Sequence, residues 1–415
     1  MLRATFVKTA ISLTAITAFT VPIAHAEIKL TASDAAMSDV FGQTLDISSN
    51  LAIVGAYGND DHGPESGSAY IFDTTTGNQV RKLTASDAAA GDNFGYSVGI
   101  SGNLAIVGAH GEDYNGPESG SAYIFDMNQK GKQVHKLTAT EVGADDDNFG
   151  FSVGISGSTA IIGAPQNNDH GSNSGSAYLF NANTGNEIAK LTASDAAASD
   201  KFGNVVAISG NTAIVGAPGN NDHGAFSGSA YLFDTTTESE IAKLTASDAA
   251  GLDFFGSSVA ISNGIAIVGA PNNGDNGAGS GSAYLFDATT GNEITKLTAS
   301  DAAAGAQFGY SVGISNGLAI VSAIHNQNNG LFTGAAYIFD INTGLEVAKL
   351  TASDGAQSDQ FGAFVGIDGY TAIVGANWDD DHGNSSGSAY LYTVPEPASL
   401  ALLSLGTLLL IKRRK

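Results

Sequence analysis

The residues most able to bind a metal ion recur at regular places in this sequence. The tripeptide Asp-His-Gly occurs four times, and Asp275-Asn276-Gly277 is a variant of it. Each copy would bind alone, because Zn–N bonds are only about 2.0–2.1 Å long and separate copies cannot converge on one ion. An Asx-type turn that glycine closes also explains the element, and we favour this interpretation over metal binding. Carboxylate oxygens suit Ca²⁺, so calcium is the cofactor to consider, with candidate ligands Asp60, Asp61, Asp169, Asp222, Asp275, Asp379, Asp380 and Asp381.

Three aromatic residues break the repetition of the polar loops that contain them. They are Phe226, Phe332 and Trp378. Such planar side chains suit stacking on a sugar ring or anchoring an apolar peptide. Catalysis needs a unique convergence of nucleophile, base and orienting group, which copies of one residue spread over many repeats do not provide. The sequence therefore predicts a binding protein without enzymatic activity.

A Ser-Asp dipeptide also recurs, ahead of a run of small residues. It predicts a capped single helical turn, which we favour over a ligand-binding role. The copies are Ser33-Asp34, Ser86-Asp87, Ser194-Asp195, Ser247-Asp248, Ser300-Asp301 and Ser353-Asp354.

All these residues belong to one long repeat. The element Lys-Leu-Thr-Ala begins at residues 29, 82, 136, 190, 243, 296 and 349. A period near 50 residues is typical of a β-propeller. Each unit holds four short segments rich in Val, Ile, Tyr, Phe and Thr and bounded by turn residues, which predicts four strands. In the fourth unit these strands are expected at 204–209, 212–217, 229–234 and 240–247.

The two ends of the repeated region favour a closed ring. The region opens with a fourth-strand segment, Ile28 to Thr31, and closes with a third-strand segment, Ser388 to Tyr392. The set of strands is therefore offset by one. In a seven-bladed propeller of four-stranded antiparallel blades, the N-terminal strand would complete the last blade and leave only short protected edges. A linear β-solenoid is the alternative, and it would leave both end units incomplete.

Two short motifs connect the repeat to a family. Phe-Gly begins at 41, 94, 149, 202, 255, 308 and 361, and Gly-Ala at 55, 108, 163, 216, 269 and 375. Over residues 28–393 this pattern resembles the FG-GAP repeat, which builds the seven-bladed propeller of integrin α-subunits and many bacterial surface proteins. The resemblance implies calcium loops of the form D-x-D-x-D-G between the first and second strands. Here those connections are tight turns such as Ser209-Gly210-Asn211, so these calcium sites are not carried over.

The lengths of the connections predict two unlike faces. The first-to-second and third-to-fourth connections are tight turns, whereas the other two are long and rich in Asp and Asn, as at 219–227 and 194–201. Alternate connections of a blade emerge on opposite faces, so the long loops share one face. Binding sites concentrate on such loops, and we expect the ligand there.

Both ends of the chain carry transport signals. Residues 1–26 have the basic start, apolar stretch and A-x-A site of a signal peptide, with cleavage predicted at Ala24 and Ala26; an uncleaved anchor is the alternative. At the other end, Pro395, Glu396 and Pro397 precede an apolar run, 398–411, and a basic end, 412–415. That run is shorter than the ~20 residues that span a bilayer comfortably.

This arrangement resembles the PEP-CTERM sorting signal. The resemblance implies a transient inner-membrane anchor that an exosortase recognises and removes in Gram-negative bacteria that make exopolysaccharide. A permanent anchor is the alternative. The predicted domains are thus a signal peptide at 1–26, a propeller at 27–393 and a sorting tail at 394–415, with delivery to the cell surface or extracellular matrix.

The net charge and the absence of cysteine exclude some classes of partner and chemistry. The net charge is −24, and there is no cysteine, so neither disulfides nor thiol chemistry contribute. An acidic body is repelled by nucleic acid. We expect an exported, non-enzymatic surface or matrix propeller that binds exopolysaccharide or a surface protein through its acidic long-loop face, with calcium as an aid. The alternatives are a structural matrix or biofilm component without a discrete ligand and an enzyme with an axial active site.

Overall fold

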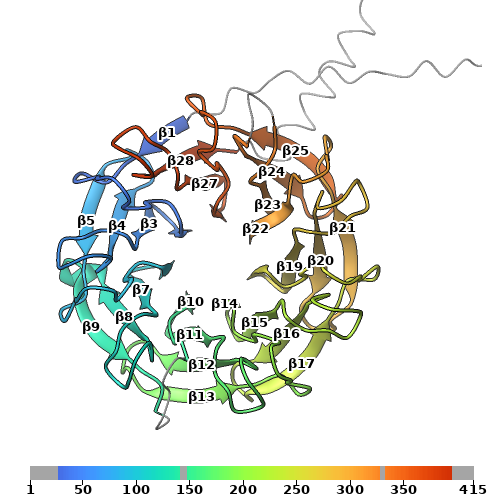
Figure 1. The fold of residues 1–415 in the computed structure, drawn as a ribbon, viewed down its shortest axis with the longest axis horizontal. Coiled ribbons are helices and arrows are strands. Elements are labelled where there is room, and N and C mark those ends of the chain that lie inside the picture. Colours follow the sequence, from blue (N-terminus) through green and yellow to red (C-terminus); the bar gives the residue numbers. More distant parts are fainter. Residues whose placement is uncertain (1–26, 141–146, 328–331, 395–415) are drawn as a thin grey trace, which may run out of the picture.

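The computed structural model describes residues 27–140, 147–327 and 332–394. Seven four-stranded antiparallel sheets stand as blades around a central channel (Figure 1), which confirms the predicted seven-bladed propeller. Blade 1 holds β2–β5, blade 2 β6–β9, blade 3 β10–β13, blade 4 β14–β17, blade 5 β18–β21 and blade 6 β22–β25. Blade 7 holds β26–β28 together with β1.

The first two strands of each blade lie nearest the channel. The first strands are β2 (Leu45–Ser48), β6 (Ser97–Ser101), β10 (Ser152–Ser156), β14 (Val205–Ser209), β18 (Ser258–Ser262), β22 (Phe308–Ser315) and β26 (Val365–Asp368). The second strands are β3 (Leu51–Ala56), β7 (Leu104–Ala109), β11 (Thr159–Ala164), β15 (Thr212–Ala217), β19 (Ile265–Ala270), β23 (Leu318–Ala323) and β27 (Thr371–Ala376).

The third and fourth strands lie further out. The third strands are β4 (Ser68–Asp73), β8 (Ser121–Asp126), β12 (Ser176–Asn181), β16 (Ser229–Asp234), β20 (Ser282–Asp287), β24 (Ala335–Asp340) and β28 (Ser388–Thr393). The outer strands are β1 (Glu27–Leu30), β5 (Gln79–Leu83), β9 (Lys132–Leu137), β13 (Glu187–Leu191), β17 (Ser239–Leu244), β21 (Glu293–Leu297) and β25 (Leu345–Leu350). A short 3₁₀ helix, η1 (Met127–Gln129), joins β8 to β9.

The N-terminal strand closes the ring as the strand offset predicts. In blade 7 the strand order is β1-β28-β27-β26, and Glu27 to Leu30 pair antiparallel with Tyr392 to Ala389. In the fourth repeat, the outer strand ends at Leu244 instead of residue 247, because Ser247 already leaves the sheet. Its backbone N–H and hydroxyl donate to Glu293 of the next blade, at 2.8 and 2.9 Å.

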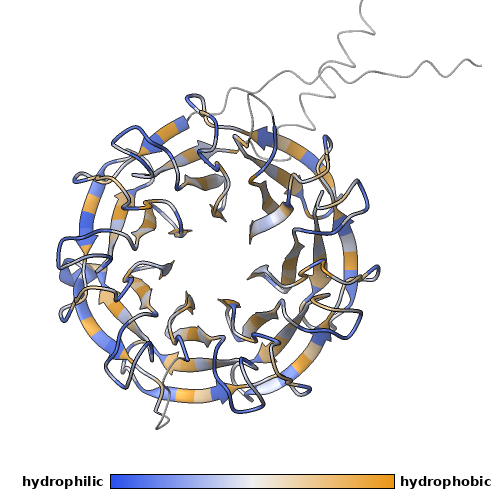
Figure 2. Ribbon diagram, in the orientation of Figure 1, coloured by the Kyte–Doolittle hydropathy of each residue, from blue (hydrophilic) through white to orange (hydrophobic). Residues whose placement is uncertain are grey.

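The hydrophobic core consists of layers between neighbouring blades. Between blades 3 and 4, for example, Phe202 packs edge-on against Tyr231 and Phe233, with ring centroids 5.5 and 5.8 Å apart, beside Ile161 and Leu179 of blade 3. Figure 2 shows the hydrophobic inner strands and the hydrophilic loops. The second strands are covered on both faces, which explains their continuous apolar sequence.

The strand directions define two faces that we name here. The turn face carries the tight first-to-second and third-to-fourth connections, such as Gly210-Asn211 between β14 and β15. The loop face carries the long connections, such as 218–228 between β15 and β16. Each first strand starts at the loop face and each second strand ends there. Residues just before a first strand and just after a second strand therefore meet around one end of the channel.

Candidate functional site

Each repeated lysine lies over a tyrosine ring and forms an ion pair with at least one carboxylate. In blade 4, the ammonium of Lys243 lies 5.4 Å from the ring centroid of Tyr231 and forms ion pairs with Asp195 and Asp222. Asp195 belongs to the connection from blade 3, whereas Asp222 belongs to the β15–β16 loop. The Tyr231 hydroxyl donates to Asp195 at 2.8 Å. We call this arrangement the lysine cage, and it ties outer strand, loop and incoming connection together.

The cage corrects the interpretation of the Ser-Asp dipeptides. Burial alone would raise the pKa of Asp195, but hydrogen bonds from Lys243 and Tyr231 lower it below its usual range. The segment around Asp34 forms a single hydrogen-bonded turn, with Ala35 N donating to Ala32 O at 3.2 Å, and no helix is assigned there. The predicted capped helical turn was therefore wrong, because the aspartate binds the lysine instead of capping a helix.

The same cages hold most of the calcium candidates. Six of them pair with the cage lysine of their own blade: Asp61, Asp169, Asp222, Asp275, Asp379 and Asp381. Asp60 and Asp380 instead accept hydrogen bonds from the backbone N–H groups of Glu65 and Ser385, at 2.8 and 2.7 Å. These contacts close the second-to-third loops.

Among the described residues, the blade 7 cage holds the most carboxylates. Asp379 replaces the asparagine of blade 4, Asn220, and carboxylate oxygens of Asp354, Asp379 and Asp381 lie within 4.8 Å of one another. The Lys29 ammonium lies among them at 2.7, 2.9 and 2.6 Å. A calcium ion here would have to displace this ammonium group, so the residues present do not form an open calcium site. Calcium binding stays a prediction, which the binding experiment below tests.

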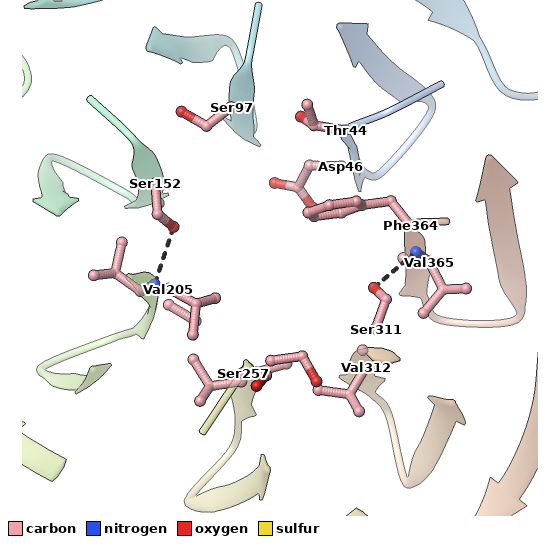
Figure 3. Close-up of a pocket in the computed structure, with 18 of the residues that line it drawn as sticks. Thr44, Asp46, Ser97, Ser152, Val205, Ser257, Ser311, Val312, Phe364 and Val365 are labelled. Atoms are coloured by element: carbon pink, nitrogen blue, oxygen red, sulfur yellow. Dashed lines mark hydrogen bonds between the residues drawn. The ribbon is translucent and has the colours of Figure 1, made fainter. Parts of the chain in front are cut away.

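The innermost strands enclose a second candidate site, the central channel. It contains a cavity of about 600 Å³ (Figure 3). Ser152 and Ser311 accept hydrogen bonds from the backbone N–H groups of Val206 and Val365 in the next blade, at 3.0 and 3.1 Å. Phe364, at the position that Ser311 holds in blade 6, points into the channel (Figure 3).

The channel opens on the loop face into another cavity, of about 610 Å³. Gln43, Gln307 and Tyr310 line both cavities. We call this shared region the axial mouth. Tyr57 and Trp378 also line it. The mouth is thus built from the two sets of strand ends that meet at the loop face.

Aromatic rings gather on one side of the axial mouth. Tyr96 contacts Tyr57 and Phe151, with ring centroids 5.5 and 5.1 Å apart, and it lies 4.2 Å from the ring of His110. Burial lowers the pKa of His110 to about 4, so its imidazole is neutral at neutral pH. Residues directly after Phe-Gly or Gly-Ala supply these rings, and they were not among the residues predicted from the sequence to bind a ligand.

Unsatisfied polar atoms lie beside the same mouth. Among the described residues, Thr44 Oγ1, His110 Nδ1 and Asn377 Oδ1 are buried without a hydrogen-bond partner. Thr44 lines the channel and Asn377 lines the mouth cavity. Such atoms are rare in folded proteins and call for an explanation. The other three such atoms of the described residues, in Tyr70, Tyr123 and Ser388, lie away from the cavities.

Of the three predicted stacking residues, Trp378 lies at the mouth, and the other two contact residues that line one of the cavities. Trp378 lines the mouth cavity and is 48% exposed. Phe226 stacks on Phe254 with centroids 5.5 Å apart, and Phe254 lines the channel. Phe332 packs edge-on against His325, 5.1 Å away, and His325 lines the mouth cavity.

Asp46 is a carboxylate in the channel wall, at a position where other blades have glycine or alanine. Its two oxygens accept hydrogen bonds from the backbone N–H groups of Ile47 and of Ile100 in the next blade, both at 2.8 Å. Burial raises the pKa of Asp46 to about 6 against these two hydrogen bonds, which lower it. Figure 3 shows the side chain in the channel.

This shift predicts a pH-dependent stability. Unfolded aspartate titrates near about 3.9, so ionisation costs the folded protein more than the unfolded chain. The stability contributed by protonated Asp46 is full below pH ~4 and is lost as the pH rises through ~6. We expect the Asp46→Asn variant to gain stability relative to the native protein over this interval, as measured by urea unfolding. A difference that stays constant from pH 4 to pH 7 would contradict the role of Asp46.

Models of known protein families match the chain from residue 25 to residue 415. Seven copies of the FG-GAP repeat match residues 25–72, 78–125, 132–180, 186–233, 239–286, 292–339 and 345–392. The PEP-CTERM protein-sorting motif matches residues 393–415. No curated protein matches the chain.

The predicted processing sites lie outside the described residues. Ala24 and Ala26 belong to this part of the chain, so the signal peptide stays a prediction. Pro395, Glu396 and Pro397 lie there too, within the matched sorting motif. That motif implies recognition by an exosortase-type enzyme and indicates export and a surface or extracellular fate in Gram-negative bacteria. Over the ranges that the structure describes, no helix is long and apolar enough to cross a membrane.

The repeat motifs have a clear structural purpose. A Cβ atom added to Gly163 of the third Gly-Ala would lie 2.0 Å from the carbonyl oxygen of Gly203 of the fourth Phe-Gly. The two motifs are thus the surfaces by which one blade contacts the next. FG-GAP propeller repeats are typically non-catalytic. The chain belongs to the FG-GAP repeat family and is an exported surface propeller that ends in a PEP-CTERM sorting motif.

Proposed function

We propose that this protein is a non-enzymatic surface or matrix propeller that binds a neutral polysaccharide at the axial mouth. The observation that carries the proposal is the group of aromatic rings at the mouth, beside cavities of about 600 and 610 Å³. Aromatic faces bind the apolar faces of sugar rings. The amide side chains of Gln43 and Gln307, which line both cavities, offer hydrogen bonds to the hydroxyl groups of such a ligand.

The lining residues favour a neutral ligand over an anionic one. No lysine or arginine lines either cavity in the described part of the chain, whereas Asp46 lines the channel. The cage lysines are engaged with carboxylates elsewhere on the loop face. Electrostatics would therefore disfavour an acidic polysaccharide or a nucleic acid at this site.

The same lining supports a non-enzymatic function. Glycoside hydrolysis requires a pair of carboxyl groups, typically about 5–9.5 Å apart. Asp46 is the one carboxylate among the described residues that line the two cavities, and both of its oxygens already accept backbone hydrogen bonds. A glycosidase site on the axis would need a second carboxyl group, which the described lining does not provide.

We expect replacement of mouth aromatics to weaken glycan binding. Trp378→Ala and Tyr310→Ala should each lower affinity for a neutral glycan about tenfold, since a lost stacking contact costs about 1.4 kcal/mol. Glycan-array screening followed by calorimetry on the exported protein would measure this. Tyr114→Ala is the matched control, because Tyr114 is 71% exposed but packs on Lys136, 4.4 Å from its ring, and does not line the mouth.

Each outcome of this experiment decides between functions. Retention of neutral glycans only, with loss in the mouth variants, supports the proposal. No retained glycan would favour the structural matrix component, and retention of a surface protein alone would favour a protein ligand. Binding that disappears with a chelator would support the calcium prediction, whereas unchanged binding would contradict it.

A further inference from the structure

The end of the described chain lies on the turn face. Val394 follows β28, is 1% exposed, and donates its backbone N–H to the carbonyl oxygen of Tyr370 at 2.7 Å. Tyr370 belongs to the two-residue turn between β26 and β27. Val394 therefore packs into blade 7, although the sequence analysis counted it with the tail. The matched sorting motif continues from this point.

A single strand separates this exit from the axial mouth. β27 begins at Thr371, next to Tyr370, and ends at Ala376, directly before the mouth residues Asn377 and Trp378. Six residues of β-strand span about 20 Å. The tail exit and the mouth thus lie on opposite faces of the same blade.

The N-terminal end leaves from the same place. Glu27 pairs with Tyr392 of β28, and the Tyr392 hydroxyl donates to its carboxylate at 3.1 Å. Figure 1 shows both ends of the described chain at blade 7. Neither end emerges beside the mouth.

We propose that the turn face is directed toward the membrane while the sorting tail holds the protein there, so that the axial mouth points away from the bilayer. The apolar run of the tail begins at residue 398, four residues after Val394. Four extended residues reach at most about 14 Å, which is less than the length of β27. Such a tether keeps the turn face next to the bilayer and prevents the ring from turning over.

The turn face itself offers little attraction for a lipid surface. Aspartates at the ends of the third strands cap its turns: Asp234, for example, accepts hydrogen bonds from Thr236 N and Thr237 N at 2.8 and 3.0 Å. Five of the third strands end in aspartate, and carboxylates do not bind anionic lipid; exposed cations of this face include Lys130 and Lys132 at the β8–β9 turn. The tail alone therefore sets the orientation, and its removal releases an intact ring.

Site-specific labels can test this orientation, because the chain contains no cysteine. Ser158 lies in the β10–β11 turn on the turn face and Ser172 in the β11–β12 loop on the loop face, and both are exposed. Full-length Ser158→Cys and Ser172→Cys proteins would each carry a fluorescent donor in vesicles of neutral lipid with a headgroup acceptor. We expect clearly greater energy transfer from position 158, with a donor height difference of about 20 Å.

Equal transfer from the two positions, or greater transfer from position 172, would overturn the proposal. A chain that ends at Val394 is the control and should show background transfer from both positions. Persistent transfer without the tail would mean that the body itself binds lipid, which also contradicts the proposal. No glycan is present, so the outcome is independent of ligand binding at the mouth.

Discussion

Replacing Lys29 by methionine is expected to loosen the strand that closes the ring. Lys29 is the cage lysine of the four-residue strand β1, and its ammonium group forms ion pairs with three carboxylates. One of them, Asp379, has a side chain only 5% exposed. Removing one partner of a buried ion pair costs about 3 kcal/mol or more, because the remaining charges lose their compensation. Opening of β1 from β28 should become roughly 100-fold more frequent.

Hydrogen exchange of the β1 and β28 peptides, followed by mass spectrometry, would measure this opening. Lys243→Met is the matched control. Its cage has Asn220 in place of Asp379, and its two aspartates are 40% and 51% exposed, so the loss should be about 1 kcal/mol or less. Exchange in the Lys243→Met variant is followed in its own β16 and β17 peptides. If exchange there accelerates as much as it does in β1 and β28 of Lys29→Met, the third carboxylate and the terminal position of Lys29 do not matter.

The ring was predictable because the four-strand unit is repeated seven times in the sequence, and its closure was predictable from the two ends of the repeated region. The strand offset between Ile28 and Tyr392 has one simple solution, which is the pairing of β1 with β28. The lysine cages were not predictable, because they join residues of three separate segments. Lys243, Asp195 and Asp222 converge only after the incoming connection folds over the loop face. From the sequence, each aspartate could be interpreted only together with its neighbours in the chain, and its pairing with a distant lysine could not be inferred.

The axial mouth was missed for a different reason. The residues that all seven repeats share are mainly packing residues, whereas the mouth is formed by positions at which the repeats differ. The residue after Phe-Gly is Gln43, Tyr96, Phe151, Asn204, Ser257, Tyr310 or Ala363. This variation was a readable signal, because that residue lies at the loop-face end of the innermost strand. In a repeat protein, a unique ligand site must come from such differences.

Replacing Gly163 by alanine is expected to disrupt the contact between blades 3 and 4. The added Cβ would lie 2.0 Å from the carbonyl oxygen and 2.9 Å from the carbonyl carbon of Gly203. Both are backbone atoms, and Gly203 also donates its N–H to Gly216 O at 3.1 Å, so neither can move aside without breaking the blade. Overpacking of this kind costs about 3 kcal/mol, to be measured by urea unfolding.

Gly274→Ala is the control, since a Cβ at Gly274 meets no atom within 4 Å, and its effect should stay below about 0.5 kcal/mol.

The contact between blades 6 and 7 shows how the protein accommodates a side chain at this position of the repeat. Blade 6 has Ser322 in place of the Gly-Ala glycine. At this contact, a Cβ added to Gly362 of blade 7 would lie 3.0 Å from Ala335 O, whereas a Cβ added to Gly203 would lie 2.2 Å from Ser176 O. The blades have moved apart, and the Ser322 hydroxyl accepts a hydrogen bond from Ser311 N at 3.0 Å. Alanine at position 163 has no hydroxyl to compensate, so an unchanged unfolding midpoint for Gly163→Ala would refute the close backbone contact as the reason for glycine in the repeat.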